Sequence, residues 1–348
     1  MTCAGRLPAD RETAVRTLAL LLATVAATGL VACDDTETED VPDLGPRTWS
    51  VGLETGEAGA LLSVWGPTAD DVWTVGGQLD AGAAWHNDGT GWRRAEVPDG
   101  PLLNWVHGCG DVLWMVGNDG RALRRIGAGP FEAVATGETQ DLWGVWCAGP
   151  DRAWAVGGDA IATETPADPV IIEWDGNGWS RPALPALDRE SRAWFKVWGT
   201  GPDNVIVVGA RGTIARWDGA AWTQELAGTS RDFVSLWGTG PDDIVAVGGR
   251  ANGMAARFDG SAWQHEVLVR EPGMNGVWVA EDGTAHIVGL RGRVLDMPTG
   301  AYDYTRDPND DITLLHAIWG IDGRPRFAVG GTLDSSPPWT GILLEAAR

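Results

Sequence analysis

The chain has 348 residues, and its acidic residues outnumber its basic residues so strongly that the formal net charge is −22 at pH 7. Such a surface excludes nucleic acid as a partner, because binding to a phosphate backbone needs clustered Lys and Arg side chains. The chain contains 49 Gly and 21 Trp but only 2 Tyr and 5 Phe, a bias that indicates a repeated motif.

The N-terminal segment, residues 1–32, has the features of an export signal. An Arg-containing start is followed by an apolar run from Leu18 to Val31, which is too short for an ordinary membrane span. The run ends in Leu30-Val31-Ala32-Cys33, which resembles the bacterial lipobox. This resemblance implies a lipoprotein signal peptide and a lipid on Cys33; an ordinary cleaved signal or an uncleaved anchor is the alternative. We therefore expect an extracytoplasmic, membrane-anchored lipoprotein, in the periplasm or at the cell surface.

Residues 33–46 are acidic and contain few large apolar side chains, so they cannot bury enough surface to fold. We expect a disordered tether there, followed by one domain from residue 47 to residue 348. Within that domain, Cys109 and Cys147 are the cysteines that remain in an oxidising compartment, which makes them a candidate disulfide. Two buried thiols are the alternative.

A motif of about 40 residues recurs seven times in the remaining chain. Its Trp recurs at Trp65, Trp146, Trp198, Trp237, Trp278 and Trp319, with His107 in the second copy. A Val-Gly pair recurs in step, from Val75-Gly76 to Val329-Gly330. Periods near 40 to 45 residues with several short β-like runs in each copy are typical of propeller blades. The sequence therefore predicts an all-β fold, a seven-bladed β-propeller with four-stranded blades.

The two ends of the domain are predicted to meet in one blade. The seventh copy supplies three strands and then ends, whereas Arg47-Thr48-Trp49-Ser50-Val51 looks like an isolated outer strand. We expect this N-terminal strand to join the last blade and close the ring, which removes the unpaired edge of an open array. The repeated Trp side chains are predicted to fill the wedge between neighbouring blades.

The turn before the outer strand contains Asp-Gly-x-x-Trp in four copies, which begin at Asp88, Asp175, Asp218 and Asp259. These turns resemble shortened Asp boxes of the BNR and sialidase-like propellers. The chain is also similar to bacterial surface lipoproteins that carry VWG and WDG repeats. Asp boxes are structural in that family, so the resemblance implies the fold and not an activity.

No catalytic motif stands out in the chain. A sialidase would need an Arg triad and a Tyr–Glu pair, but Tyr302 and Tyr304 lie in the outer part of the sixth copy. No phosphate loop, Ser/His/Asp signature or zinc spacing occurs. We therefore expect no catalytic residue, cofactor or metal. The predicted function is a monomeric, non-catalytic binding or scaffold module for an envelope protein or glycan. The alternative is a glycan hydrolase or lyase, which would place a carboxylate pair over the channel mouth.

One face of the propeller is predicted to be the binding face. The irregular connections, residues 159–168, 182–193 and 331–341, all fall on the side of the turns between the second and third strands. Variable loops on a rigid scaffold are where binding usually resides. Equivalent turn positions there hold Arg211, Arg250 and Arg291 in copies four to six, and Asp119 and Asp159 in copies two and three. These residues would form a positive arc opposite a negative one, suited to a carboxylate, sulfate or zwitterionic ligand. Ordinary solvated turn residues are the alternative.

Four further residues are candidates for a pocket where the central channel opens, at the entry to the inner strands. They are Trp143, Lys196, Asn275 and His316. Packing at the edge of the strands is the alternative to ligand binding.

Overall fold

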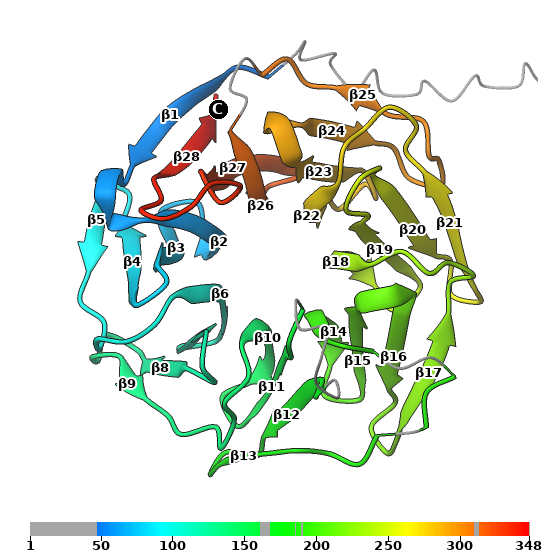
Figure 1. Ribbon diagram of the computed structural model, residues 1–348, viewed down its shortest axis with the longest axis horizontal. Coiled ribbons are helices and arrows are strands. Elements are labelled where there is room, and N and C mark those ends of the chain that lie inside the picture. Colours follow the sequence, from blue (N-terminus) through cyan, green and yellow to red (C-terminus); the bar gives the residue numbers. More distant parts are fainter. Residues whose placement is uncertain (1–46, 161–167, 185, 189–190, 310–312, 348) are drawn as a thin grey trace, which may run out of the picture. The chain divides into compact units, whose positions relative to one another are not determined.

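A computed structural model describes residues 47–160, 168–184, 186–188, 191–309 and 313–347. The predicted signal peptide, Cys33 and the tether lie outside these residues. In the described part, 28 strands form seven four-stranded antiparallel sheets. The sheets are arranged radially around a central axis (Figure 1). The predicted seven-bladed propeller is confirmed.

The blades are numbered from the first complete copy, and their strands are given from the axis outward. Blade 1 contains β2 (Ala60–Thr68), β3 (Asp71–Gln78), β4 (Ala81–Asn87) and β5 (Trp92–Ala95). Blade 2 contains β6 (Leu103–Cys109), β7 (Val112–Gly117), β8 (Ala122–Ile126) and β9 (Glu132–Ala133). Blade 3 contains β10 (Leu142–Gly149), β11 (Arg152–Gly157), β12 (Val170–Trp174) and β13 (Trp179–Ser180). Blade 4 contains β14 (Trp194–Gly201), β15 (Asn204–Gly209), β16 (Thr213–Trp217) and β17 (Trp222–Leu226).

The second half of the ring follows the same order. Blade 5 contains β18 (Phe233–Gly240), β19 (Asp243–Gly248), β20 (Met254–Phe258) and β21 (Trp263–Val267). Blade 6 contains β22 (Met274–Val279), β23 (Ala285–Gly289), β24 (Val294–Met297) and β25 (Thr305–Arg306). Blade 7 contains β26 (Leu314–Ile321), β27 (Arg324–Gly331), β28 (Gly341–Ala346) and β1 (Trp49–Glu54). Single 3₁₀ turns are η1 (Gly56–Ala58), η2 (Ala210–Gly212) and η3 (Leu290–Gly292).

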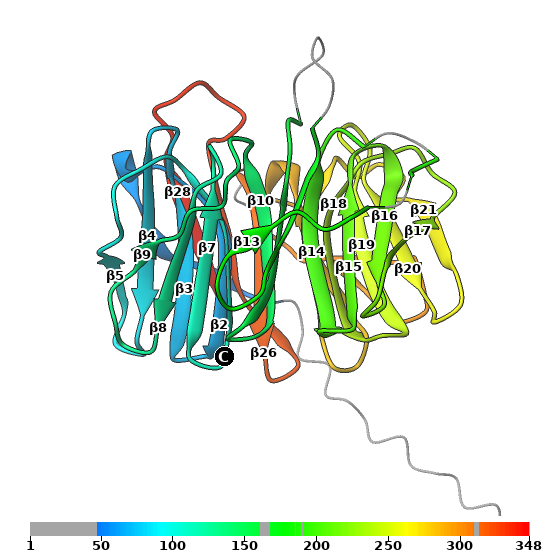
Figure 2. The ribbon, with the colours of Figure 1, turned by 90° about the horizontal axis from the view of Figure 1, so that it is seen from below.

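The ring closes through β1, as predicted. β1 pairs antiparallel with β28, so that Trp49 lies opposite Ala346 and Glu54 lies opposite Ile342. The chain therefore enters and leaves on one face of the propeller, which we call the termini face. The turns between second and third strands lie on the opposite face, which we call the loop face (Figure 2).

Four inner-strand tryptophans, Trp65, Trp146, Trp198 and Trp278, pack on a glycine of the next blade, which explains the recurring glycine. A Cβ atom added at Gly199 would lie 2.9 Å from the indole ring of Trp146, and one at Gly238 would lie 2.8 Å from the ring of Trp198. Any side chain at these glycines would push the ring out of the wedge between the blades. Trp146 and Trp198 are buried as a result.

The repeated Val-Gly pair also has a steric cause. A Cβ atom at Gly76 would lie 1.9 Å from the carbonyl oxygen of Ala60, and one at Gly330 would lie 1.8 Å from that of Leu314. The glycine thus lets the inner strand approach the second strand closely at the loop face.

A hydrogen bond across the boundary between blades repeats in four places. The indole N–H of an outer-strand Trp donates to a carboxylate on the preceding blade, an arrangement we call the tryptophan latch. The pairs are Trp92 with Glu345 at 2.8 Å, Trp222 with Glu173 at 3.2 Å, Trp263 with Glu225 at 2.6 Å, and Trp49 with Asp307 at 2.9 Å. Hydrogen bonds to charged groups contribute about 1.5–3 kcal/mol each. The latches therefore hold neighbouring blades together at the outer rim.

The Asp-Gly-x-x-Trp turns position three of these latch tryptophans. In blade 4, Asp218 Oδ1 accepts hydrogen bonds from the backbone N–H groups of Ala220 at 2.9 Å and Ala221 at 2.8 Å. These bonds lower the pKa of Asp218. The turn places Trp222 directly after it on the outer strand, so the Asp has a structural role.

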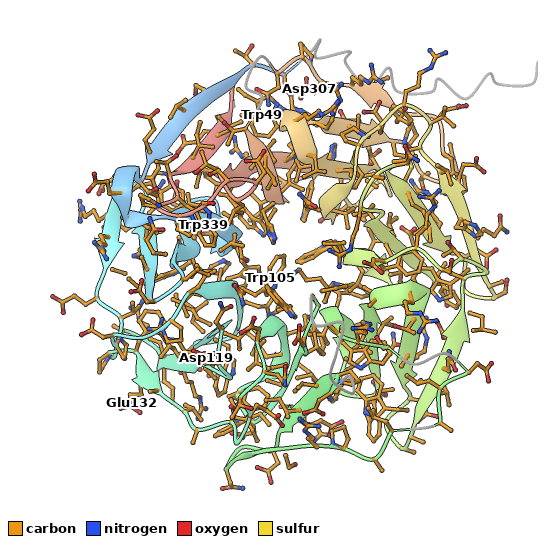
Figure 3. The ribbon with its side chains drawn as sticks, in the orientation of Figure 1. Trp49, Trp105, Asp119, Glu132, Asp307 and Trp339 are labelled. Carbon is orange, nitrogen blue, oxygen red and sulfur yellow. A yellow bond between two sulfur atoms is a disulfide. The ribbon has the colours of Figure 1, made fainter. Side chains whose placement is uncertain are left out.

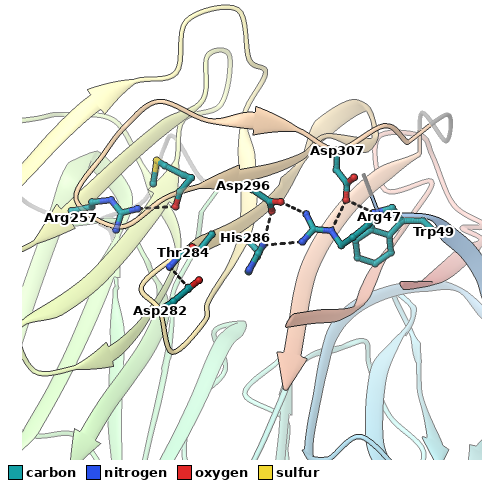
Figure 4. Close-up of polar contacts among 9 residues, drawn as sticks. Arg47, Trp49, Arg257, Asp282, Thr284, His286, Asp296 and Asp307 are labelled. Carbon is teal, nitrogen blue, oxygen red and sulfur yellow. Dashed lines mark hydrogen bonds and ion pairs between the residues drawn. The ribbon is translucent and has the colours of Figure 1, made fainter. Parts of the chain in front are cut away.

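The latch at the closure site includes a second donor, Arg47 (Figure 4). Its guanidinium donates from Nε to Asp307 at 2.6 Å and from Nη2 to Asp296 at 2.5 Å. Asp296 also pairs with His286 at 2.6 Å. Because the Asp307 side chain is only 3% exposed, its negative charge needs these donors. The network fixes the start of the N-terminal strand to blade 6.

Cys109 and Cys147 form a disulfide, with their Cα atoms 5.9 Å apart. Cys109 ends the inner strand of blade 2, and Cys147 lies in the inner strand of blade 3. The bond joins two blades next to His107, which takes the place of the repeated Trp. Burial lowers the pKa of His107 to about 3, so the imidazole is neutral and packs between Trp65 and Trp146.

Removing the disulfide should destabilise the propeller. The bond closes a loop with a sequence separation of 38 residues, and closing such a loop stabilises a fold by about 2–4 kcal/mol. We expect the Cys109→Ala/Cys147→Ala variant to unfold at a lower denaturant concentration than the oxidised protein. A reducing agent should shift the parent and leave the variant unchanged. Equal midpoints for the oxidised parent and the variant would contradict this prediction.

Candidate binding site

The loop face carries the longest connections of the described chain. In Figure 2 the connection between β27 and β28 rises above this face. It is anchored to blade 1, because the Gln78 amide donates to Trp339 O at 2.8 Å and accepts from Trp339 N at 2.9 Å. Residues 161–167 of the connection in blade 3 lie outside the described residues. The described loops thus include one well-fixed segment that presents Pro337, Pro338 and Trp339.

The predicted turn residues do not share one backbone conformation. Arg211 and Arg291 are at the tips of η2 and η3 in the left-handed region, with φ of 59° and 60°, and Asp119 resembles them with φ of 56°. In blade 5 the left-handed position is taken by Gly249, so Arg250 follows it in ordinary backbone. All three Arg side chains are exposed on the loop face.

Two aspartates that sequence reasoning missed organise these turns. Asp232 accepts the backbone N–H of Arg211 at 2.8 Å and the guanidinium Nε of Arg250 at 2.5 Å. Asp141 accepts the backbone N–H of Asp119 at 3.1 Å in the same way. The sequence pattern that could have identified them is an Asp directly before the inner strand, which occurs in blades 3 and 5. Asp232 therefore neutralises part of the predicted positive arc.

The predicted negative arc is strengthened by Asp141. Burial, followed by the charges of Asp119 and Asp159, raises the pKa of Asp141. The structure thus brings Asp119 and Asp159 near a third carboxyl group between blades 2 and 3. Within the described residues, no group of three or more His, Cys, Asp or Glu side chains is arranged to hold a metal ion.

A β-bulge occurs in every inner strand at the loop-face end of the channel, as the register shifts show. Trp143, Asn275 and His316 are the bulged residues of blades 3, 6 and 7. A bulge re-aims its side chain, and here the side chain reaches a neighbouring carbonyl. The Asn275 amide donates to Leu315 O at 3.0 Å, and His316 Nδ1 lies 2.7 Å from Leu62 O. Sequence reasoning missed Asn104, the equivalent residue of blade 2.

Lys196 directly follows the bulged position of blade 4, and it is only 4% exposed. Its Nζ donates to Trp143 O at 3.0 Å and lies 3.9 Å from the centre of the Trp105 ring, which points into the middle of the propeller (Figure 3). Burial lowers the pKa of Lys196 to about 7. Burial and then the charge of Lys196 lower the pKa of His316 to about 4, against the hydrogen bond to Leu62, which raises it.

The channel mouth therefore contains donors and aromatic rings, and Lys196 forms no ion pair with a carboxylate in the described part of the chain. The four predicted residues lie there, and none of them carries a carboxyl group. The tyrosines are at the rim instead, where Tyr302 donates to Gln264 O at 2.7 Å. In the described residues, no helix is long and apolar enough to cross a membrane.

Replacing Lys196 by Met should stabilise the protein below pH 7, because the fold no longer buries an ammonium group. The pKa of Lys196 falls from 10.5 to about 7 on folding. Between these values the unfolded parent binds more protons than the folded parent, so parent stability rises with pH. The advantage of the variant, measured by denaturant unfolding, should be largest below pH 7 and shrink toward pH 10.5. An advantage that is independent of pH would refute this account.

Comparison with known proteins supports the fold alone. No family model and no curated protein matches the chain. Among solved structures, the chain is similar to YCF48 bound to D1 peptide, with a TM-score of 0.60 and 15% identity over 88% of this chain and 98% of that one. YCF48 from Cyanidioschyzon merolae gives 0.61 and 16%, over 85% and 98% of the two chains. The WD40 propeller domain of Doa1 gives 0.59 and 12%, over 85% and 97%. The chain thus has the architecture of these propellers.

Proposed function

We propose that this protein is a lipid-anchored binding module of the cell envelope, which holds a partner protein on its loop face and performs no chemistry on it. The observation that carries the proposal is the separation of the two faces. The longest connections of the described chain gather on one face, while the chain enters and leaves at the other (Figure 2). A rigid scaffold that presents variable loops on one side is a common design for binding.

An anchor at Cys33 would suit this arrangement. Arg47, the first described residue, lies at the termini face, where it pairs with Asp296 and Asp307. A lipid on Cys33 would therefore connect to the propeller from the termini face. The loop face would then be free to meet proteins of the envelope.

The groups at the channel mouth favour binding over catalysis. A glycosidase needs two carboxyl groups about 5–9 Å apart, whereas Trp143, Lys196, Asn275 and His316 supply none. The Lys196 ammonium and the Asn275 amide each carry further N–H groups beyond those that donate to Trp143 O and Leu315 O. Such donors suit carbonyl or carboxylate oxygens, which a peptide provides. The similarity to a propeller that was solved with a peptide bound supports a protein rather than a glycan as the partner.

Replacing Cys33 by Ala should release the protein from membranes, because a cysteine thiol is the only attachment point that the lipobox offers for the lipid. The measurement is membrane fractionation together with the mass of the N-terminal peptide. We expect the parent in the membrane fraction with a lipid on Cys33, and the variant in the soluble fraction. An unchanged distribution and an N-terminal peptide without lipid would refute the anchor.

The loop face is tested by affinity capture from an envelope extract with the mature lipoprotein. We expect the triple variant Arg211→Ala, Arg250→Ala and Arg291→Ala to capture its partner at least about tenfold less, because charged hydrogen bonds contribute about 1.5–3 kcal/mol each. Arg324→Ala is the matched control, since Arg324 is exposed at the start of β27 on the termini face.

Two outcomes would overturn the proposed function. One is capture of the same proteins by the parent and the triple variant in equal amounts. The other is saturable binding on a glycan array by a protein that captures no partner. Turnover of an array glycan would favour the hydrolase or lyase instead.

A further inference from the structure

Three blade boundaries lack the tryptophan latch, namely those between blades 1 and 2, blades 2 and 3, and blades 5 and 6. Blade 2 has no Asp-Gly-x-x-Trp turn, and its outer strand is only Glu132–Ala133. Blade 6 also lacks the turn, but there Arg257 of blade 5 donates to the carbonyls of Ala301 and Pro298 at 3.1 and 2.7 Å. That boundary is therefore filled by protein. Between blades 2 and 3, Trp179 packs against Trp114 with ring centres 5.0 Å apart. Between blades 1 and 2, in contrast, open cavities remain.

Two cavities of about 240 and 350 Å³ lie in this open boundary. Both are lined by Trp73, His86 and Arg125, so they form one continuous groove with Arg125 at its middle. The groove runs from the termini-face turn of blade 2 to the outer strand of blade 1, where Arg93 lies. An elongated groove of this kind fits an extended chain better than a compact ligand.

The floor of the groove is aromatic and its middle is cationic. Trp73 and His86 stack with ring centres 4.0 Å apart, and Phe131 meets Trp73 edge-on at 5.4 Å. The Arg125 guanidinium lies 4.9 Å from the Trp73 ring centre and donates from Nε to Gly129 O at 3.0 Å. No hydrogen bond within the described residues uses its two terminal amino groups. Stacking thus holds a planar donor pair that matches a carboxylate.

The charges around the groove select the kind of partner. Arg93, Arg94 and Arg125 line the groove in a protein whose net charge is −22. Asp71 and Asp111 line the inner end and Glu96 lines the outer end. Carboxylates at both ends disfavour a uniformly acidic ligand. The pattern suits a single carboxylate at the centre of an otherwise apolar segment.

We infer that the groove between blades 1 and 2 binds an extended segment of a partner protein, with one Asp or Glu side chain on the Arg125 guanidinium and apolar neighbours on Trp73 and Phe131. The site is separate from the loop face and does not depend on the function proposed for that face. It extends from the termini face to the outer rim, so it leaves the loop face open.

The test uses the full propeller and an array of short peptides with Glu at the centre and Ala, Val, Leu or Phe at the flanks. A second array carries Gln in place of Glu. We expect saturable binding to a subset of Glu peptides and at least about tenfold weaker binding to their Gln counterparts, because the bidentate ion pair is lost. Equal binding of Glu and Gln peptides, or no binding to either array, would overturn the inference.

Variants locate the binding on the protein. Arg125→Gln should lose most of the affinity for the best Glu peptide, and Arg324→Gln on the termini face should retain it. Ala128→Trp should also block binding, since Ala128 is exposed and lines the outer cavity. Because Ala128 is exposed, its substitution should not unfold the propeller. Thermal unfolding of each variant checks that the fold is retained. Unchanged affinity in both groove variants would refute the site, as would complete competition by free sulfate at the ionic strength of the assay.

Discussion

The packing of an inner-strand Trp on a glycine of the next blade is the contact on which the propeller depends. A single blade is apolar on both faces and cannot bury them alone, so each blade is stable only between two neighbours. The indole ring is the largest side chain that can fill the wedge. It fits because the residue behind it has no Cβ, as at Gly199 and Gly238. The ring as a whole then needs both ends of the chain in one sheet, which β1 and β28 provide.

At the outer rim the wedge is wider, and polar contacts take over from packing. The latch tryptophans donate to carboxylates of the preceding blade, and Arg47 adds a charged contact at the closure. The same repeat therefore supplies both apolar and polar cohesion. Where the repeat loses its outer-strand Trp, the boundary must be filled in another way, as Arg257 does in blade 5, or a groove remains.

The two candidate surfaces follow from departures from the repeat. The loop face carries the connections of unequal length, because surface loops on a rigid scaffold are free to vary. The groove between blades 1 and 2 exists because the outer strand of blade 2 carries no Trp. The channel mouth is different in kind, since its bulges are present in every blade and only the side chains vary. Lys196 and His316 are therefore unusual in side-chain type only, because the backbone around them is the same in every blade.

The sequence by itself determined the architecture of this protein. Seven copies in two registers predict seven blades, because both registers are steric requirements: the Trp-Gly pair packs one blade on the next, and the Val-Gly pair packs two strands together. The isolated strand around Trp49 likewise predicts closure. Turn positions such as Arg211 and Arg291 could be aligned from the same period.

Only the tertiary structure decided which side chains meet. The partners of the latch tryptophans are up to 258 residues away, as for Trp49 and Asp307, and no local pattern links them. Asp232 and Asp141 were missed because their role appears only when a turn of one blade meets the inner strand of the next. The groove was missed for the same reason. Contacts that recur in every repeat can be predicted from the period of the sequence. The effect of a missing repeat residue cannot, because it depends on how the two neighbouring blades pack.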